Sequence, residues 1–190
     1  MELSEVIVRI CKVLDKNRIA YMIIGGQAVS VHGYPRLTED IDITLGLNVS
    51  DAEKILNLLP DLNAEPLTKD PSDFIKTTWV LPVKEKDSGI KIDFTFSFSD
   101  YEQQAIQNAK RIDVAGYNVS FCSLEDLIIH KVFAGRPRDL EDVKNLYVKN
   151  KRVLNRDYIL QWLKSFDSSV DGNKINYTKI FIEIEKTEQQ

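Results

Sequence analysis

A short stretch with alternating apolar and acidic residues constrains this chain most. In residues 40–45, Asp-Ile-Asp-Ile-Thr-Leu, an aliphatic residue occupies every second position. Side chains alternate between the two faces of a β-strand, so one face of this stretch is apolar and the other bears Asp40 and Asp42. Two neighbouring carboxylates repel each other unless one is protonated or a cation lies between them. The pattern therefore favours a hard divalent cation with oxygen ligands, such as Mg²⁺ or Mn²⁺.

A third carboxylate lies in a second stretch with the same alternation. The apolar positions of residues 90–96 are Ile90, Ile92, Phe94 and Phe96. Asp93 therefore faces the other way, and it would join Asp40 and Asp42 if the two strands pair, which makes a site for one or two metal ions. Residues 74–83 predict a further strand, joined to this one as a hairpin through an exposed connection at residues 84–89.

A pair of glycines precedes the acidic strand. Residues 19–24 predict a short buried strand, and Gly25 and Gly26 permit a tight turn and a close approach of backbone to a ligand. A helix beginning at Gln27 would direct its N–H groups toward that ligand. The glycines alone favour a simple strand-to-helix turn without a ligand. Because carboxylates follow fifteen residues downstream, phosphate binding becomes the favoured interpretation. Arg36 is either a triphosphate ligand or a solvated surface residue, with equal weight.

A lysine stands on the apolar side of a predicted helix that begins at residue 124. The stripe consists of Leu124, Leu127, Ile128, Lys131 and Val132. The ammonium group of Lys131 must therefore find an anion or extend to water. Asp139, at the start of the next helix, is the expected partner, although it could simply complement the helix dipole. Asp142 is expected to be a surface residue.

Composition sets broad limits on the chain. It has 190 residues, 43% hydrophobic and 28% charged residues, and a net charge of −4. These values are typical of a globular protein, and no apolar run approaches the ~20 residues of a membrane span. Cys11 and Cys122 form neither a metal-binding pattern nor a disulfide framework, and the N-terminus lacks the pattern of a signal peptide, so a cytoplasmic location is expected.

A basic segment lies near the C-terminal helices. Residues 144–156 contain no acidic residue, and their basic residues are Lys144, Lys149, Lys151, Arg152 and Arg156. Such a run is more often a solvated face than a binding surface, but contact with RNA stays open.

The motifs together resemble the polymerase-β-type nucleotidyltransferase superfamily. The resemblance rests on the turn at residues 25–28, on His32-Gly33, Pro35-Arg36 and residues 38–42, and on Asp93. The sequence of these motifs is similar to that of the small AbiEii-like toxin branch. The run from Lys131 through residues 135–139 to Asp142 also resembles the lysine and Arg-Asp motif of that branch. The superfamily often has Gly-Ser at the turn, and this chain has Gly25-Gly26, so the serine hydroxyl is missing.

The resemblance implies an α/β (α+β) nucleotidyltransferase fold, with a mixed sheet flanked by helices. We predict a core over residues 1–121 and a helical C-terminal extension packed on it over residues 122–190. The implied reaction moves a nucleoside monophosphate from a nucleoside triphosphate, such as ATP, to an acceptor hydroxyl.

The resemblance also implies roles for the candidate residues. Asp40 and Asp42 would bind both metal ions, and Asp93 would complete one of them. Backbone N–H groups of Gly25, Gly26 and Gln27 would hold the phosphates. Lys131 would pair with triphosphate charge, oriented by Asp139.

The sequence does not identify a single acceptor or partner. An RNA, with tRNA first, is the leading acceptor, and a cognate antitoxin is a candidate partner. The alternatives are an antibiotic or protein adenylyltransferase and a non-catalytic nucleotide-binding protein of the same fold.

Overall fold

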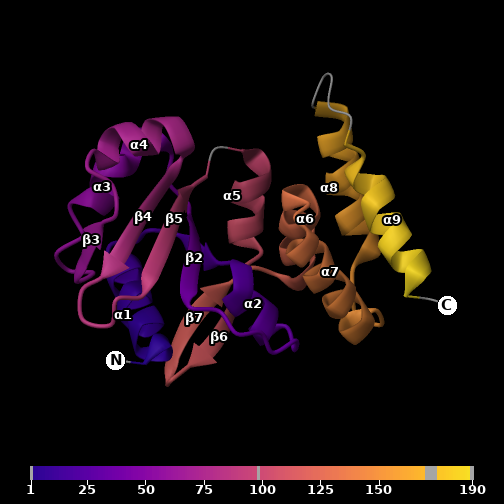
Figure 1. Cartoon of the computed structure of the whole chain (residues 1–190), viewed down its shortest axis with the longest axis horizontal. Coiled ribbons are helices and arrows are strands. Elements are labelled where there is room, and N and C mark those ends of the chain that lie inside the picture. Colours follow the sequence, from indigo (N-terminus) through magenta and orange to yellow (C-terminus); the bar gives the residue numbers. More distant parts are fainter. Residues whose placement is uncertain (1, 98, 170–174, 189–190) are drawn as a thin grey trace. The chain divides into compact units, whose positions relative to one another are not determined.

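A mixed β-sheet and a set of helices make up the computed structural model, which describes residues 2–97, 99–169 and 175–188 (Figure 1). The strands are β1 (Tyr21–Ile23), β2 (Asp40–Leu45), β3 (Ala64–Pro66), β4 (Val80–Glu85), β5 (Lys91–Phe96), β6 (Lys110–Val114) and β7 (Tyr117–Phe121). The helices are α1 (Leu3–Lys16), α2 (Gly25–Val31), α3 (Ala52–Leu56), α4 (Pro71–Thr78), α5 (Asp100–Gln107), α6 (Leu124–Ala134), α7 (Pro137–Asn150), α8 (Arg156–Ser169) and α9 (Tyr177–Thr187), with a 3-10 turn at Val49–Asp51. The predicted α/β class is therefore confirmed.

The chain divides into two compact units. The first contains residues 1–28 and 36–122 and holds the whole sheet, whereas the second contains residues 29–35 and 123–190 and is helical. The sequence predicted a division after residue 121, and the contacts divide the chain near that point but place residues 29–35 with the helical unit.

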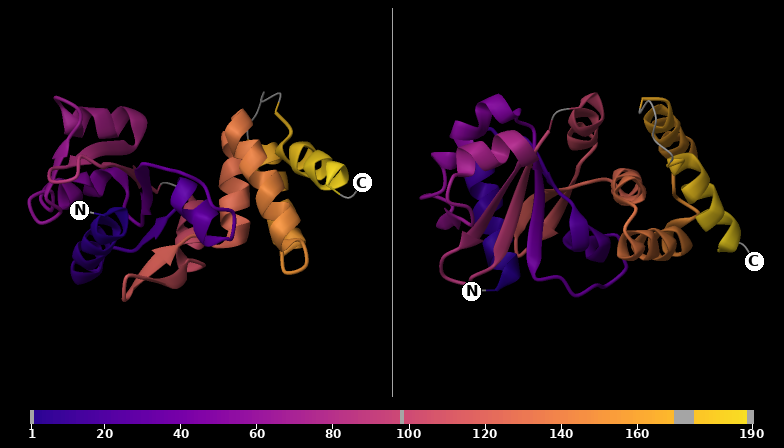
Figure 2. Two further views of the ribbon diagram at one scale, coloured as in Figure 1. Left: turned by 60° about the horizontal axis from the view of Figure 1, so that its bottom comes forward. Right: turned by 45° about the horizontal axis from the view of Figure 1, so that its top comes forward.

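The sheet of the first unit has the strand order β3-β4-β5-β2-β1-β7-β6. β2 runs parallel to β5, and β1 runs parallel to β7, while the other neighbours are antiparallel. The strands lie side by side in the views of Figure 2, and α1 contacts β7 while α5 contacts β2. This order places the two strands with the predicted acidic faces next to each other at the centre of the sheet.

The alternation predicted for these two strands is observed. The apolar residues of β2 and β5 are fully buried, namely Ile41, Ile43, Leu45, Ile92, Phe94 and Phe96. Each such side chain contributes about 1.5–3 kcal/mol by leaving water, so the apolar faces fix which way the strands turn. Asp42 and Asp93 are consequently directed to the other face, where they are half-buried.

The first part of the strand predicted at residues 74–83 belongs instead to helix α4, whereas residues 80–83 lie in β4 as predicted. Asp70 caps this helix, because its Oδ1 accepts the backbone N–H of Asp73 at 3.0 Å, and Pro71 occupies the first turn. The helix ends at Trp79, which has a left-handed φ of 62°, and β4 starts at the next residue. The local capping signals therefore outweighed the β-branched and aromatic residues of this stretch. The hairpin of β4 with β5 is confirmed.

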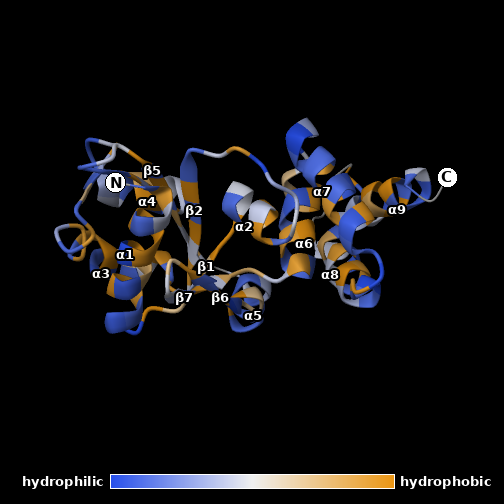
Figure 3. Ribbon diagram, turned by 90° about the horizontal axis from the view of Figure 1, so that it is seen from below, coloured by the Kyte–Doolittle hydropathy of each residue, from blue (hydrophilic) through white to orange (hydrophobic). Residues whose placement is uncertain are grey.

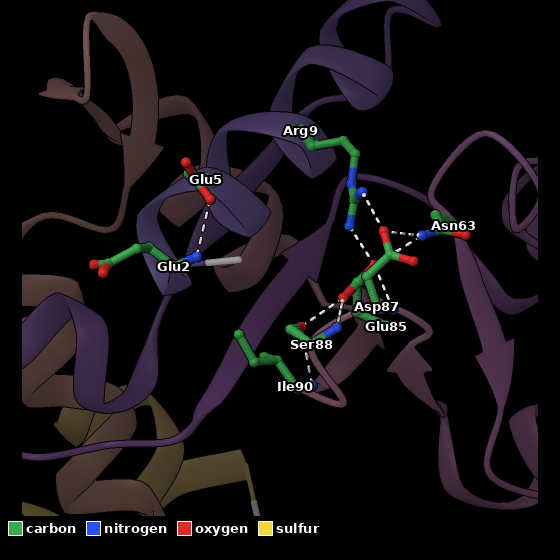
Figure 4. A network of polar contacts seen from close by, with 8 residues as sticks. All are labelled: Glu2, Glu5, Arg9, Asn63, Glu85, Asp87, Ser88 and Ile90. Carbon is green, nitrogen blue, oxygen red and sulfur yellow. Dashed lines mark hydrogen bonds and ion pairs between the residues drawn. The ribbon is translucent and has the colours of Figure 1, made fainter.

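Glu85, within the connection predicted at residues 84–89, is the last residue of β4 and has a fully buried carboxylate (Figure 4). Its oxygens accept hydrogen bonds from Arg9 Nη2 at 2.5 Å, Asn63 Nδ2 at 2.9 Å and Ser88 N at 2.6 Å. The Ser88 hydroxyl and the Asp87 N–H also donate to it. Residues 86–87 are exposed as expected, but Glu85 ties the hairpin to α1 and to the residue before β3.

The second unit packs its helices around apolar residues of α6. Hydrophobic residues dominate α6, whereas hydrophilic residues cover much of α7 (Figure 3). Phe133 stacks on Tyr177 with a ring separation of 5.1 Å, and Tyr147 meets the ring of Phe181 edge-on at 6.3 Å. Within the described ranges, the helices are all too short or too polar to cross a bilayer.

Candidate functional site

The centre of the candidate site is a pair of aspartates on neighbouring strands. β2 and β5 pair in register, with Asp42 opposite Asp93. Neighbouring strands lie about 4.8 Å apart, so side chains of opposed residues on one face are close neighbours. Asp40 lies two residues before Asp42 and therefore points to the same side of β2, where it is exposed. The pairing on which the predicted convergence depended is observed.

Burial and charge both act on Asp93. The pKa of Asp93 is raised, mainly by burial and next by the charge of Asp40. Lys91 has a smaller effect in the opposite direction. A carboxyl group that is destabilised in its charged form accepts a proton or a cation readily. The influence of Asp40 also indicates that these two carboxylates share one electrostatic environment.

The glycine turn is fitted to Asp42. Gly25 has a left-handed φ of 67°, and a Cβ atom at this position would lie 1.8 Å from Asp42 Oδ2. Ile24 also donates its N–H to the Asp42 carbonyl at 3.0 Å. Only glycine therefore allows the turn backbone to lie directly against the carboxylate.

Gly26 is also constrained, by a different side chain. A Cβ atom on Gly26 would lie 2.7 Å from Thr38 Cβ and 2.8 Å from Thr38 Oγ1. The Thr38 hydroxyl in turn donates a hydrogen bond to Asp40 Oδ1. Sequence reasoning did not select Thr38, because its proximity to Gly26 depends on the path of residues 36–39.

The remaining predicted ligands of the first unit are half-buried. Gln27 lies in the first turn of α2, and its Nε2 atom is buried and makes no hydrogen bond with any described residue. Arg36 lies in the segment between α2 and β2. Both residues belong to the same unit as the aspartates.

The carboxylates have the chemistry of a magnesium site. Their oxygen atoms are the donors that Mg²⁺ and Mn²⁺ prefer, and the space over Gly25 is kept open for the Asp42 carboxylate. Among the residues that the structure describes, no three histidine, cysteine, aspartate or glutamate side chains are grouped closely enough to hold a metal ion. The donor set therefore suits the ion, whereas the coordination geometry is not formed.

Lys131 and Asp139 come together in the second unit. Lys131 Nζ lies 3.1 Å from Asp139 Oδ1, and only 5% of the lysine side chain is exposed. Arg136 donates from Nε to the other oxygen of Asp139 at 2.5 Å. Burial would raise the pKa of Asp139, but the hydrogen bonds and charges of Arg136 and Lys131 outweigh it and lower that pKa.

Asp142 is not the surface residue that the sequence suggested. It is buried and accepts a hydrogen bond from Lys131 Nζ at 2.6 Å, so it is a second anionic partner of this lysine. Residues three positions apart share one face of a helix, and the spacing of Asp139 and Asp142 could have indicated this.

Most of the basic segment at residues 144–156 is exposed. Its basic residues are all exposed, namely Lys144, Lys149, Lys151, Arg152 and Arg156. Arg156 differs, because its Nε donates to Glu185 Oε1 at 2.8 Å. The surface available to a polyanion is therefore smaller than the sequence suggested.

Solved structures share this fold at low sequence identity. ANT(2″)-Ia in complex with adenylyl-2″-tobramycin has a TM-score of 0.60 and 16% identity, over 87% of this chain and 97% of that chain. The lincosamide antibiotic adenylyltransferase LnuA, bound to lincomycin, has a TM-score of 0.53 and 16% identity, over 75% and 94%. An antigenic nucleotidyltransferase-like protein from Paracoccidioides brasiliensis has a TM-score of 0.54 and 19% identity, over 76% and 75%. At these identities the similarity concerns the fold.

Family membership is shown by the sequence as a whole. No curated protein matches the chain. One family, described as nucleotidyltransferases of unknown function (DUF6036), matches residues 1–189. This match covers the glycine turn and all three strand aspartates, and so agrees with the superfamily that the motifs indicated, although it does not select the AbiEii-like branch. With nearly its whole length matched, the chain belongs to the DUF6036 family of nucleotidyltransferases.

Proposed function

We propose that this nucleotidyltransferase carries out a metal-dependent transfer of a nucleoside monophosphate from a nucleoside triphosphate to an acceptor hydroxyl, with release of pyrophosphate. The observation that carries the proposal is the in-register pair of Asp42 and Asp93, with the backbone of Gly25 against Asp42. Carboxylates beside an open backbone turn can serve both a metal ion and the phosphates that it bridges. ATP is the first donor to test, because a protein of similar fold is known with an adenylylated product.

The three aspartates would hold Mg²⁺ or Mn²⁺. Asp40 and Asp42 would contact both ions, and Asp93 would contact the one nearer the acceptor. When bound, such ions neutralise charge on the triphosphate and activate the attacking oxygen. As the carboxylate assigned to the acceptor side, Asp93 would also take up the proton of the acceptor hydroxyl.

The turn and its neighbours would bind the phosphates. Backbone N–H groups at Gly25, Gly26 and Gln27 would donate to phosphate oxygens, and Arg36 would add a positive charge. This assignment is supported by the closeness of Gly25 to Asp42, which brings the turn to the acidic face. The predicted triphosphate contact of Lys131, with Asp139 orienting it, stays a prediction, because both carboxylates near Lys131 already neutralise it.

The catalytic assignment is tested by replacing each aspartate with asparagine. We expect Asp42→Asn and Asp93→Asn to abolish nucleotide incorporation from labelled ATP while far-UV circular dichroism stays that of the wild type. Asp113→Asn, on the edge strand β6, is the matched control and should leave incorporation unchanged. Full Mg²⁺-dependent activity in either variant would refute the assignment. Nucleotide binding without incorporation in the wild type would instead favour a non-catalytic binding protein.

The acceptor is proposed to be an RNA, with tRNA tested first. The support is the exposed basic segment of Lys144, Lys149, Lys151 and Arg152. A small hydroxyl compound is the second candidate, favoured by the two antibiotic adenylyltransferases of similar fold. Protein acceptors and a cognate antitoxin stay predictions from the sequence.

The two acceptors can be separated by salt and by charge removal. Each RNA phosphate contact releases counterions, so RNA affinity should fall with salt at a log–log slope of roughly −0.7 per contact for single strands. We expect the triple replacement of Lys149, Lys151 and Arg152 by alanine to flatten this slope and reduce RNA labelling. Equal labelling by both proteins at two salt concentrations would contradict the RNA assignment, and transfer to tobramycin or lincomycin would support the second candidate.

A further inference from the structure

Thr38 connects the glycine turn to the acidic strand. It lies in the segment before β2, where its hydroxyl donates a hydrogen bond to Asp40 Oδ1. The side chain is half-buried, whereas Asp40 itself is exposed. An exposed aspartate can adopt several rotamers, so a donor bound to one oxygen restricts the orientation of its carboxylate.

The position of Thr38 is fixed by Gly26. The space that a side chain at residue 26 would occupy is filled by Thr38, whose Cβ, Oγ1 and Cγ2 atoms lie 2.7, 2.8 and 2.9 Å from the site of the absent Cβ. The hydroxyl that a Gly-Ser turn would present is missing here, and the Thr38 hydroxyl lies over the same glycine. The absence of a side chain at Gly26 and the presence of Thr38 are therefore two parts of one packing arrangement.

We propose that Thr38 is a positioning residue that orients Asp40 for metal binding. The inference rests on the proposed function, because it takes Asp40 as a metal ligand. Residues that orient metal ligands through hydrogen bonds typically change metal affinity by about 10- to 100-fold when they are replaced. Both partners of Thr38 belong to one unit of the chain, so the arrangement does not depend on the other unit.

The first experiment measures Mn²⁺ binding directly, by electron paramagnetic resonance of the free ion, with and without a non-hydrolysable ATP analogue. Thr38→Val keeps the side-chain shape and removes the hydroxyl, and we expect it to weaken Mn²⁺ binding by about tenfold. Thr38→Ser restores the hydroxyl and should bind within about twofold of the wild type, the resolution expected of such a titration.

The matched control is Thr44→Val. Thr44 lies on the same strand as Asp40, is buried, and its Oγ1 makes no hydrogen bond with any described residue. The same substitution there removes a hydroxyl without removing an orienting contact, and should leave Mn²⁺ binding unchanged. Thermal unfolding of each variant checks that the comparison is made on folded protein.

A second experiment approaches the same contact from Gly26. The methyl group of Gly26→Ala would displace Thr38, so this variant should lose Mn²⁺ affinity to the same degree as Thr38→Val. Because both changes break one contact, their effects should not add in the double variant. Additive losses would show that Gly26 acts independently of Thr38.

The outcomes separate this inference from the proposed function. A wild-type protein that binds Mn²⁺, together with a Thr38→Val variant that binds it equally well, would overturn the role of Thr38 and leave the metal site intact. Loss of binding in Thr38→Val that is not recovered in Thr38→Ser would also overturn it, because a hydroxyl at residue 38 would then not be enough to orient Asp40. A wild type without Mn²⁺ binding would refute the metal site itself, and the role of Thr38 with it.

Discussion

Glu85 offers the sharpest test of how this fold is stabilised. Its carboxylate is fully buried and accepts hydrogen bonds from Arg9, Asn63, Ser88 and the backbone of the hairpin. Glu85→Gln keeps the shape of the side chain but replaces one accepting oxygen with an NH₂ donor. At least one of the N–H or O–H groups that now point at the carboxylate would then face another donor.

The contribution of Glu85 to the free energy of unfolding follows from the pKa of its carboxyl group. Burial would raise the pKa of Glu85, but the hydrogen bonds from Ser88, from the Asp87 N–H and from Arg9 outweigh it and lower that pKa from 4.5 to about 2. A shift of this size corresponds to about 3 kcal/mol. Because Arg9 keeps 26% of its side chain in water, solvent screening reduces the expected contribution to about 2 kcal/mol.

The pH dependence has a definite sign. A carboxyl group with a lowered pKa in the folded state stabilises the protein above the unfolded pKa of about 4.5, and this contribution is lost as the pH falls toward 2. The difference in unfolding free energy between wild type and Glu85→Gln should therefore be largest near pH 7. At pH 3 it should be less than about half of that value.

The assay is urea unfolding followed by tryptophan fluorescence. A Trp162→Phe background leaves Trp79 as the reporter, and Trp79 lies in the same unit as Glu85. Asp87→Asn is the matched control: its side chain is 58% exposed, so we expect a change below about 0.5 kcal/mol. An unfolding free energy for Glu85→Gln within 0.5 kcal/mol of the wild type, or a difference that does not vary with pH, would refute the reasoning.

Two further substitutions test the packing around the candidate site and the buried lysine. Gly25→Ala should lower nucleotide transfer by about 100-fold, because its methyl group would displace the Asp42 carboxylate. The matched control is Gly116→Ala, since Gly116 has a comparable φ of 81° and open space around it. This control should lose about 1–2 kcal/mol of stability without loss of transfer. Lys131→Met should lower the unfolding free energy by about 3–5 kcal/mol, since it removes the buried ammonium group from Asp142 and leaves Asp139 with Arg136 as its cation. Urea unfolding followed at Trp162 measures this loss, and wild-type stability combined with weakened ATP binding would favour the triphosphate contact instead.

The strand alternation and the glycine turn could be predicted because they depend on local geometry. A period of two in β2 and β5 sends apolar residues to one face whatever their neighbours are, and burial of Ile41 and Phe94 enforces it. The need for glycine at residue 25 likewise follows from a tight turn. What local geometry could not settle was whether Asp93 would lie opposite Asp42, since that depends on which strands pair.

The residues that sequence reasoning misplaced are those whose surroundings come from another helix or strand. Glu85 was expected in an exposed connection, but its buried position depends on Arg9, 76 residues away. Asp142 was expected at the surface, and it is buried because Lys131 of the preceding helix needs a second anion. In both cases a charge is buried only because a partner is supplied by tertiary packing.

The sequence by itself therefore determined the class of the fold, the acidic faces of two strands and the superfamily that the motifs resemble. Periodicity and turn chemistry are local properties, which can be read without knowing the neighbours of a residue in space. The tertiary structure alone decided the register of Asp42 with Asp93, the contact of Thr38 with Gly26 and the burial of Glu85 and Asp142. These depend on strand order and on side-chain packing between different segments of the chain. Burying each of these polar groups costs free energy unless its hydrogen-bond or ionic partner is buried beside it.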